Sequence, residues 1–211
     1  GVRVSSAKTG PDYIDPSFHA TASGRPCINL DGWAMRATLL DALVARAARD
    51  ADLLIVEGVM GLFDGAVAVG AINNGSTADL AERQGWPVVL VIDARAQAQS
   101  VAALAKGFRD HRPSLRFAGV ILNRVAGERH ALLLTKALED EGITVFGAVP
   151  RTSGLNVPSR HLGLVQAGEH PDIEAFINEA ARGVSTTVDL QLLQRSARPV
   201  DIGAAKDAPI P

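Results

Sequence analysis

The residues V-R-V-S-S-A-K-T-G-P-D-Y-I-D-P (Val2–Pro16) decide the fold class, because a short β-branched run leads directly into a lysine and two aspartates. A second stretch has the same organisation, since the apolar run Asp52–Val56 leads into E-G-V-M-G-L-F-D-G (Glu57–Gly65). In an open parallel sheet, ligands bind outside the carboxyl ends of the strands. Carboxylates at these ends suit Mg²⁺, which prefers oxygen ligands and usually arrives with substrate phosphates. The two stretches therefore indicate a nucleotide-dependent enzyme.

The composition of the 211 residues fits one α/β domain. Hydrophobic residues make up 47% and aromatic residues only 4%, which suits an aliphatic core around a buried parallel sheet. The formal net charge of −2, without a long basic run, predicts no nucleic-acid partner. The single cysteine, Cys27, cannot form a disulfide within the chain and fits a reducing cytoplasm. Every apolar run is shorter than the roughly 20 residues that span a bilayer, so no membrane partner is predicted.

Five apolar runs without polar alternation are predicted to be strands of a parallel sheet buried on both faces. They are Val2–Ala7, Asp52–Val56, Pro87–Ile92, Phe117–Leu122 and Thr144–Val149. Segments with helical spacing separate or follow them: Gly32–Asp50, Ser76–Gln84, Ala94–Asp110, Gly127–Glu141 and Pro171–Arg182. This alternation predicts right-handed βαβ crossovers and a doubly wound, mostly parallel sheet flanked by helices.

One residue directly follows each predicted strand, and these residues are Lys8, Glu57, Asp93, Asn123 and Pro150. If all five strands run parallel, these residues lie along a single edge of the sheet. The functional site is expected at that edge.

Five motifs follow one another in a fixed order. They are K-T-G-P-D-Y-I-D-P-S-F-H (Lys8–His19), E-G-V-M-G-L-F-D-G (Glu57–Gly65), V-I-L-N-R-V (Val120–Val125), V-P-R (Val149–Arg151) and R-H-L-G-L (Arg160–Leu164). In order and spacing they closely resemble the family of cobyrinic acid and hydrogenobyrinic acid a,c-diamide synthases, over roughly residues 1 to 182. The resemblance implies a P-loop NTPase-like fold related to dethiobiotin synthetase. It also implies a cytoplasmic ligase that uses ATP and Mg²⁺.

The resemblance further implies that parts of the family's proteins are missing from this sequence. The Walker A pattern G-x-x-x-x-G-K-[ST] does not occur in it; the family has this loop, and the strand before it, just upstream of the segment that matches Gly1. A glutamine amidotransferase domain with a nucleophilic cysteine is also absent. We therefore expect residues 1–183 to form an N-terminally truncated synthetase domain and residues 184–211 a tail or linker toward the missing amidotransferase domain. Such a fragment is expected to be inactive by itself.

The resemblance implies a corrinoid acid as the substrate and glutamine-derived ammonia from the fused amidotransferase domain as the nitrogen source, and it is compatible with a homodimer. It also assigns a role to each matching residue. The catalytic residues would be Lys8, Asp12 and Asp64, and the Mg²⁺ ligands Glu57 and Asp12. The nucleotide-binding residues would be Asn123, Pro150, Arg151 and Gly58, and the substrate contacts Tyr13, Ile14, Asp15 and His19.

Ordinary structural roles remain open for several of these residues. Asp12 also fits an Asx turn or a helix cap, and Asp64 fits a turn in its D-G pair. Asp15, Asn123, His19 and Tyr13 also fit capping, turn or packing roles. Ser76 and Thr77 begin a predicted helix whose N-terminus could hold an anion, although capping alone explains them as well.

Other functions remain open beside the a,c-diamide synthase. Cobyric acid synthase and dethiobiotin synthetase share the core, but the first lacks G-P-D-Y-I-D-P after its lysine and the second uses CO₂ rather than ammonia. A partition-type or septum-site-type ATPase explains the fold and Asn123 but not the paired acidic motifs. A plain α/β domain with turn-forming residues at its strand ends is the least specific alternative.

Overall fold

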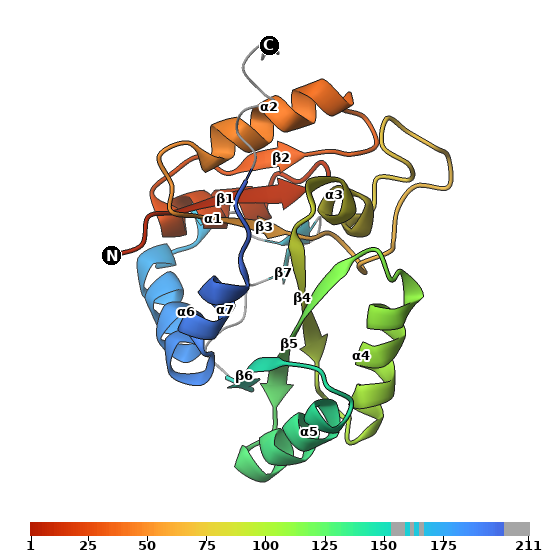
Figure 1. The fold of residues 1–211 in the computed structure, drawn as a ribbon. Coiled ribbons are helices and arrows are strands. Elements are labelled where there is room, and N and C mark those ends of the chain that lie inside the picture. The colour runs from red at the N-terminus through yellow and green to blue at the C-terminus, as the bar shows by residue number, and fades with distance from the viewer. Residues whose placement is uncertain (153–158, 161–162, 165–166, 201–211) are drawn as a thin grey trace. The chain divides into compact units, whose positions relative to one another are not determined.

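The computed structural model describes residues 1–152, 159–160, 163–164 and 167–200 (Figure 1). The chain divides into two compact units. The first comprises residues 1–84 and the described residues within 157–173 and 198–211, and the second comprises the described residues within 85–156 and residues 174–197. Each unit contains a three-stranded parallel sheet with helices packed against it. This organisation confirms the predicted α/β class with parallel sheets.

The first unit is built on a sheet with the strand order β2-β1-β3. Its strands are β1 (Val4–Thr9), β2 (Ile28–Leu30) and β3 (Leu53–Glu57). Its helices are α1 (Asp15–Ser23), α2 (Ala37–Ala48) and α3 (Thr77–Gln84), and it also contains the hairpin of β7 (Ser159–Arg160) with β8 (Gly163–Leu164) and the short 3₁₀ helix η1 (Ala167–Glu169). Helix α2 buries Leu40, Val44 and Ala47, at the three- and four-residue spacing of an amphipathic helix.

The second unit is built on a sheet with the order β4-β5-β6. Its strands are β4 (Pro87–Asp93), β5 (Arg116–Val125) and β6 (Val145–Pro150). Its helices are α4 (Ser100–His111), α5 (Glu128–Asp140), α6 (Ile173–Thr187) and α7 (Leu190–Ser196). Its core joins Val120 and Leu122 of β5 to Leu134 and Leu138 of α5. None of the helices within the described ranges is long and apolar enough to cross a membrane.

All five predicted strands are present, with ends that differ by a few residues. The predicted end of the helix before Gly142 is also confirmed. Helix α5 ends at Asp140, and Gly142 follows with a φ of +66°, a left-handed conformation that glycine adopts without strain.

The predicted helices need four corrections. Helix α1 was not among them; it begins at Asp15, and Pro16 lies in its first turn, where a missing N–H is tolerated. Helix α2 begins at Ala37 rather than Gly32. Helix α4 begins at Ser100 rather than Ala94, because Ala96 has a φ of +55° and interrupts the segment. Helix α6 continues through Gly183 to Thr187, and α7 makes part of the predicted tail helical. The boundary between synthetase domain and linker stays a prediction.

The loop between β3 and α3 is held by hydrogen bonds to Trp33. The Trp33 indole N–H donates to the carbonyl of Ala68 at 2.9 Å, and the Trp33 carbonyl accepts from the N–H of Ala71 at 2.8 Å. Gly75 has a φ of +73° and lies so close to this tryptophan that an added Cβ would be 2.7 Å from the Trp33 Cβ. The sequence N-N-G (Asn73–Gly75) therefore has glycine where both the backbone conformation and the packing require it.

The substitution Gly75→Ala is expected to lower the free energy of unfolding by about 2–5 kcal/mol, because left-handed strain costs roughly 1–2 kcal/mol and overpacking roughly 1–3 kcal/mol. Gly24→Ala is the matched control, since Gly24 has a φ of +66° but nothing within 4 Å of an added Cβ. Urea unfolding of both variants separates strain from packing. Equal losses of stability would contradict the packing role of Trp33.

Candidate active site at the carboxyl ends of β1 and β3

Lys8 and Glu57 lie next to each other at the carboxyl ends of adjacent parallel strands. In the sheet register, Lys8 of β1 pairs with Glu57 of β3 on one side and with Asn29 of β2 on the other. Residues at the same level of neighbouring strands direct their side chains to the same face of a sheet. The predicted meeting of the two strand-end motifs is therefore confirmed by the register.

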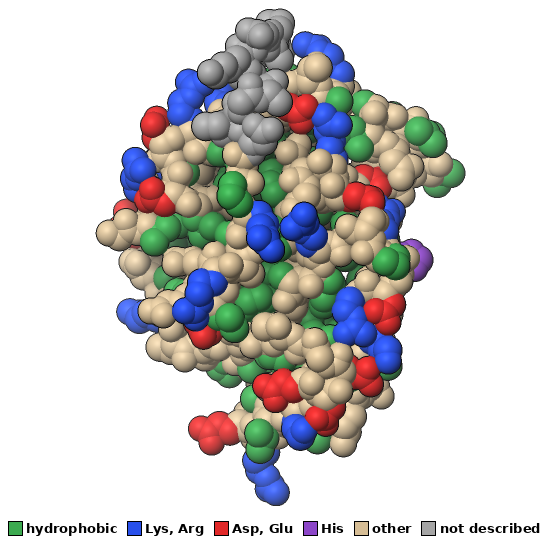
Figure 2. Space-filling model, viewed as in Figure 1, with side chains coloured by type: hydrophobic (Ala, Val, Ile, Leu, Met, Phe, Trp, Pro, Cys, Tyr) green, Lys and Arg blue, Asp and Glu red, His purple; other side chains and the backbone are tan. Residues whose placement is uncertain are grey.

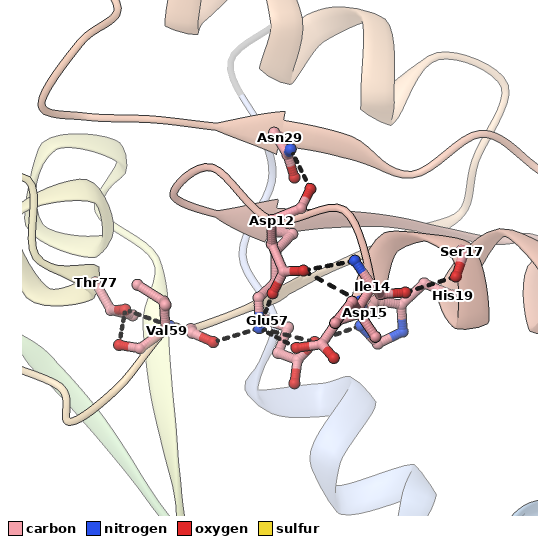
Figure 3. Close-up of polar contacts among 11 residues, drawn as sticks. Asp12, Ile14, Asp15, Ser17, His19, Asn29, Glu57, Val59 and Thr77 are labelled. Carbon is pink, nitrogen blue, oxygen red and sulfur yellow. Dashed lines mark hydrogen bonds and ion pairs between the residues drawn. The ribbon is translucent and has the colours of Figure 1, made fainter. Parts of the chain in front are cut away.

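The ammonium group of Lys8 is the centre of the site, and Figure 3 labels its three acidic neighbours, Asp12, Asp15 and Glu57. Lys8 is only 3% exposed. It donates a hydrogen bond to Oδ2 of Asp15 at 2.7 Å and another to the carbonyl of Gly58 at 3.1 Å. Its Nζ also lies 3.3 Å from Oε2 of Glu57 and 3.7 Å from Oδ2 of Asp12. One buried cation thus organises three carboxylates that come from two separate sequence motifs.

The surroundings of Lys8 keep it charged. Burial by itself would lower the pKa of Lys8, but the hydrogen bond to Asp15 and the negative charges of Glu57 and Asp15 outweigh burial and raise it. An ammonium group whose charged form is favoured in this way, and which is held in a fixed place, is suited to stabilising negative charge that develops on a reacting group.

The Oε2 of Glu57 contacts the imidazole of His19 as well as Lys8. The Nε2 of His19 on α1 lies 2.5 Å from this oxygen. The hydrogen bond to Glu57 raises the pKa of His19, although burial opposes this. Burial would raise the pKa of Glu57, but the hydrogen bond from His19 and the charge of Lys8 together lower it. The pair therefore favours imidazolium and carboxylate, and it connects α1 to the end of β3.

Asp12 has a structural role and faces the site as well. Its Oδ1 accepts hydrogen bonds from the N–H of Ile14 at 2.8 Å and of Asp15 at 3.3 Å, which is the predicted Asx-type turn. Burial would raise the pKa of Asp12, but these two backbone hydrogen bonds and the charge of Lys8 lower it. The other oxygen, Oδ2, points toward Lys8 and is the one that a ligand could contact.

Asn29 is a site residue that the sequence analysis missed. Its Nδ2 donates to the carbonyl of Asp12 at 2.5 Å, so it fixes the acidic turn from β2. Its Oδ1 is buried without a hydrogen-bond partner among the described residues. Strand β2 has only three residues, Ile28–Leu30, with a polar residue at its centre. So short a segment does not predict a strand from the sequence alone.

The remaining residues predicted in the first unit lie around this centre or beside it. Tyr13 is 66% exposed, and Ile14 is half-buried directly before α1. Gly58 contributes its carbonyl to Lys8. Asp64 is exposed, and its Oδ2 accepts from the N–H of Gly61 at 2.8 Å within its own turn. The structure therefore gives Asp64 the turn geometry that was the alternative to a catalytic role.

The predicted nucleotide-binding residues of the second unit lie at the carboxyl ends of its strands. Asn123 pairs with Asp93 in the register, and its Oδ1 accepts from the N–H of Arg124 at 2.8 Å. Pro150 pairs with Val125, and the Arg151 N–H donates to the carbonyl of Val125 at 3.0 Å. Within this sheet the predicted strand-end residues share one edge. His161 of the R-H-L-G-L motif lies outside the described residues.

The carboxylates suit a metal that also binds a substrate. No group of three or more His, Cys, Asp and Glu side chains within the described part of the chain is placed to enclose a metal ion. Mg²⁺ does not require such an enclosure, because it usually binds one or two carboxylates together with substrate phosphates and water. Glu57 and Asp12 fit this requirement, because Lys8, His19 and backbone N–H groups occupy only some of the lone pairs of their carboxylate oxygens.

The His19–Glu57 pair predicts a pH-dependent stability. Because the pKa of His19 is raised in the folded state, its ion pair stabilises the fold fully at a pH below the ordinary pKa of 6.5. This stabilisation is lost as the pH rises through the folded-state pKa. Because the pKa of Glu57 is lowered in the folded state, its carboxylate stabilises the fold at a pH above the ordinary pKa of 4.5. This stabilisation is lost as the pH falls through the folded-state pKa. The stability lost in His19→Asn should therefore be largest between pH 4.5 and 6.5. Urea unfolding with EDTA measures this loss, and the maximum in this pH range should be lost in a Glu57→Gln background, because the hydrogen bond to Glu57 is the largest cause of the raised His19 pKa.

Acidic and basic side chains are interspersed over the face shown in Figure 2. This distribution agrees with the formal net charge of −2. It differs from the continuous basic stripe that is typical of a nucleic-acid-binding surface. The absence of a nucleic-acid partner stays a prediction.

Comparison with known proteins supports the motif-based resemblance. The curated relatives include proteins named hydrogenobyrinate a,c-diamide synthase. The one from Rhizobium meliloti (strain 1021) is 49% identical over 203 residues, which are 96% of this chain and 46% of the relative. The one from Brucella anthropi is 49% identical over 211 residues, which are 99% of this chain and 48% of the relative. The one from Rhodobacter capsulatus is 50% identical over 193 residues, which are 92% of this chain and 44% of the relative. The chain thus spans about half the length of the curated relatives it matches.

These similarities confirm the resemblance that the five motifs indicated. Residues 1–165 match the family described as the CobQ/CobB/MinD/ParA nucleotide binding domain. The match includes every site residue discussed in both units. On this ground, the chain belongs to the CobQ/CobB/MinD/ParA nucleotide-binding domain family.

Proposed function

We propose that this chain forms the carboxylate-activating part of an a,c-diamide synthase that acts on hydrogenobyrinic or cobyrinic acid in cobalamin biosynthesis. The single observation that supports this most strongly is the Lys8 cluster, which joins K-T-G-P-D-Y-I-D-P to E-G-V-M-G-L-F-D-G around one buried ammonium group. The name of the relatives, hydrogenobyrinate a,c-diamide synthase, supports a corrinoid acid as the substrate class.

The chemistry explains why such a site would need ATP. A carboxylate reacts poorly with ammonia, because attack would have to expel an oxide. In the proposed reaction a carboxylate oxygen of the corrinoid attacks the γ-phosphorus of ATP, the bond to ADP breaks, and an acyl phosphate forms. Ammonia then attacks the acyl carbon, inorganic phosphate leaves, and the proton on nitrogen passes to solvent. Phosphoryl transfer of this kind depends mainly on positioning and on neutralising charge.

The described side chains can take distinct parts in this reaction. Lys8 would neutralise negative charge on the transferred phosphoryl group or on the substrate carboxylate. Glu57 and Asp12 would hold Mg²⁺, which when bound withdraws charge from the phosphate oxygens. Asp15 would keep Lys8 in place, and the exposed Tyr13 would contact the substrate.

Further roles are proposed from the family resemblance. Ile14 and His19 would help shape the substrate side, and Asp64 would join the catalytic groups when ligands are bound. Gly58, Asn123, Pro150 and Arg151 would contact the nucleotide. For Asn123 the proposal rests on its amide, which can donate to and accept from adenine at the same time.

The complete activity is proposed for a protein of the full length of the curated relatives. There, ammonia would come from glutamine in an amidotransferase domain, and a Walker A loop would complete the phosphate site. A cytoplasmic location and a homodimer are proposed on the same basis.

ADP release tests the proposal. The sample is a protein that contains this chain and has the full length of the curated relatives. Its ADP release is measured with Mg·ATP and ammonia, in the presence and in the absence of hydrogenobyrinic or cobyrinic acid. We expect strong stimulation by the corrinoid acid and formation of mono- and diamides detectable by mass spectrometry. ATP turnover that is indifferent to corrinoids would contradict the proposal and favour a partition-type ATPase.

A further inference from the structure

We propose that Thr77 is a positioning residue that holds the turn after Glu57 in place and, through the carbonyl of Gly58, fixes the ammonium group of Lys8. This inference rests on the proposed function. It adds to the site a residue from α3, an element that none of the roles proposed for the reaction includes.

Thr77 contacts the turn with both branches of its side chain (Figure 3). Its Oγ1 accepts a hydrogen bond from the N–H of Val59 at 3.0 Å and donates one to the Val59 carbonyl at 3.4 Å. Its Cγ2 lies against Gly58, where an added Cβ would be 2.9 Å from that methyl carbon. The hydroxyl thus satisfies both backbone groups of Val59, and the methyl group packs against Gly58.

The start of α3 is itself firmly anchored, so Thr77 is a fixed support. Ser76 is fully buried, and it exchanges hydrogen bonds of 3.2 Å with Asp79 in the reciprocal pattern of a capping box. The N–H of Ala78 also donates to the carbonyl of Leu62 at 2.9 Å. These bonds explain Ser76 and Thr77 through capping and loop attachment rather than through a bound anion.

The turn held by Thr77 provides two groups to Lys8. The carbonyl of Gly58 accepts from Nζ at 3.1 Å, and Glu57, which begins the turn, places its Oε2 3.3 Å from the same nitrogen. A shift of this turn would therefore move both groups relative to Lys8. Small displacements of positioned groups reduce rates strongly, even when the displaced residue is remote from the reacting atoms.

Two substitutions separate the hydroxyl from the rest of the side chain. Thr77→Val keeps the shape and removes the hydrogen bonds, whereas Thr77→Ser keeps the hydroxyl. In corrinoid-stimulated ADP release by the full-length protein, Thr77→Val should lower kcat about 10- to 100-fold, a range typical of residues that orient ligating groups. The KM for ATP should stay unchanged, and Thr77→Ser should restore most of the rate. Thr187→Val is the matched control, because the Thr187 hydroxyl donates to the Gly183 carbonyl at 2.7 Å in α6.

A second measurement does not depend on activity. Lys8 is protected from acylating reagents by burial and ion pairing, so the acetylation rate of Lys8, followed by peptide mass spectrometry, reports how firmly it is held. Thr77→Val should raise this rate about fivefold or more, since even one of its two lost hydrogen bonds to Val59 corresponds to about that factor, while Thr187→Val should not. An unchanged Lys8 reactivity, or equal effects of the Val and Ser variants, would overturn the assignment of Thr77. Absence of corrinoid-stimulated turnover in the unmodified protein would instead overturn the proposed function.

Discussion

Replacing Lys8 with methionine is expected to lower corrinoid-dependent ADP release by about 10²- to 10³-fold, the usual effect of removing one preorganised electrostatic contact to a transition state. Methionine preserves the unbranched shape, so the loss can be assigned to the charge. Without the ammonium group, the carboxylates of Asp12, Asp15 and Glu57 lose the cation that pairs with all three of them. The negative phosphoryl group would then approach a site with less positive charge to offset these carboxylates.

Lys106→Met is the matched control for this experiment. Lys106 of α4 also pairs with a carboxylate, Glu141 at 2.8 Å, but both side chains are largely exposed. Exposed pairs of this kind contribute at most about 1 kcal/mol to stability, so the rate and the melting temperature should change little. If Lys8→Met and Lys106→Met kept equal rates in fully folded proteins, Lys8 would have no part in the reaction.

The second large effect is expected from Glu57→Gln, which should reduce ADP release by a similar factor, about 10²- to 10³-fold. Glutamine has the same shape and can still accept a hydrogen bond, but it lacks the negative charge that a hard divalent cation requires. The substitution also removes the negative charge that faces His19 at Oε2, 2.5 Å from its Nε2. We therefore expect a rise in the Mg²⁺ concentration that gives half-maximal rate.

The Mg²⁺ titration distinguishes the two roles. Lys8→Met should lower the maximal rate with little change in the Mg²⁺ midpoint, whereas Glu57→Gln should move the midpoint upward. Glu141→Gln, at an exposed carboxylate of the second unit, is the control. A Glu57→Gln variant with an unchanged midpoint would show that Glu57 positions Lys8 and His19 without holding the metal.

The centre of the site could be predicted from the sequence because it depends on strand ends. Lys8 and Glu57 each follow a buried apolar run, and two such runs in a parallel sheet bring their carboxyl ends together. The register of β1 and β3 confirms that the two residues pair directly. The same reasoning correctly placed Asp93 beside Asn123 in the second unit.

The supporting contacts could not be predicted, because they depend on elements with weak local signals. His19 reaches Glu57 only because Asp15–Ser23 is helical, and this segment has a proline in its first turn and no fully buried residue. Asn29 belongs to a strand of three residues. Thr77 was recognised as the start of a helix, but its bonds to Val59, 18 residues away, appear only in the folded structure.

Asp64 shows where motif and geometry differ. The resemblance assigns it a catalytic role, yet its carboxylate accepts a hydrogen bond from Gly61 in a local turn. A turn aspartate satisfies the D-G pattern without any ligand. Its catalytic role therefore stays a proposal.

The transfer of oxygen from substrate to phosphate tests the central claim most directly. Hydrogenobyrinic acid labelled with oxygen-18 in its carboxylates is converted by the full-length protein with Mg·ATP and ammonia, and the inorganic phosphate is analysed by mass spectrometry. Activation of the carboxylate as an acyl phosphate predicts one labelled oxygen in phosphate for each amide formed. Amide formation with unlabelled phosphate would contradict the account, because the carboxylate oxygen would then never have been bonded to phosphorus.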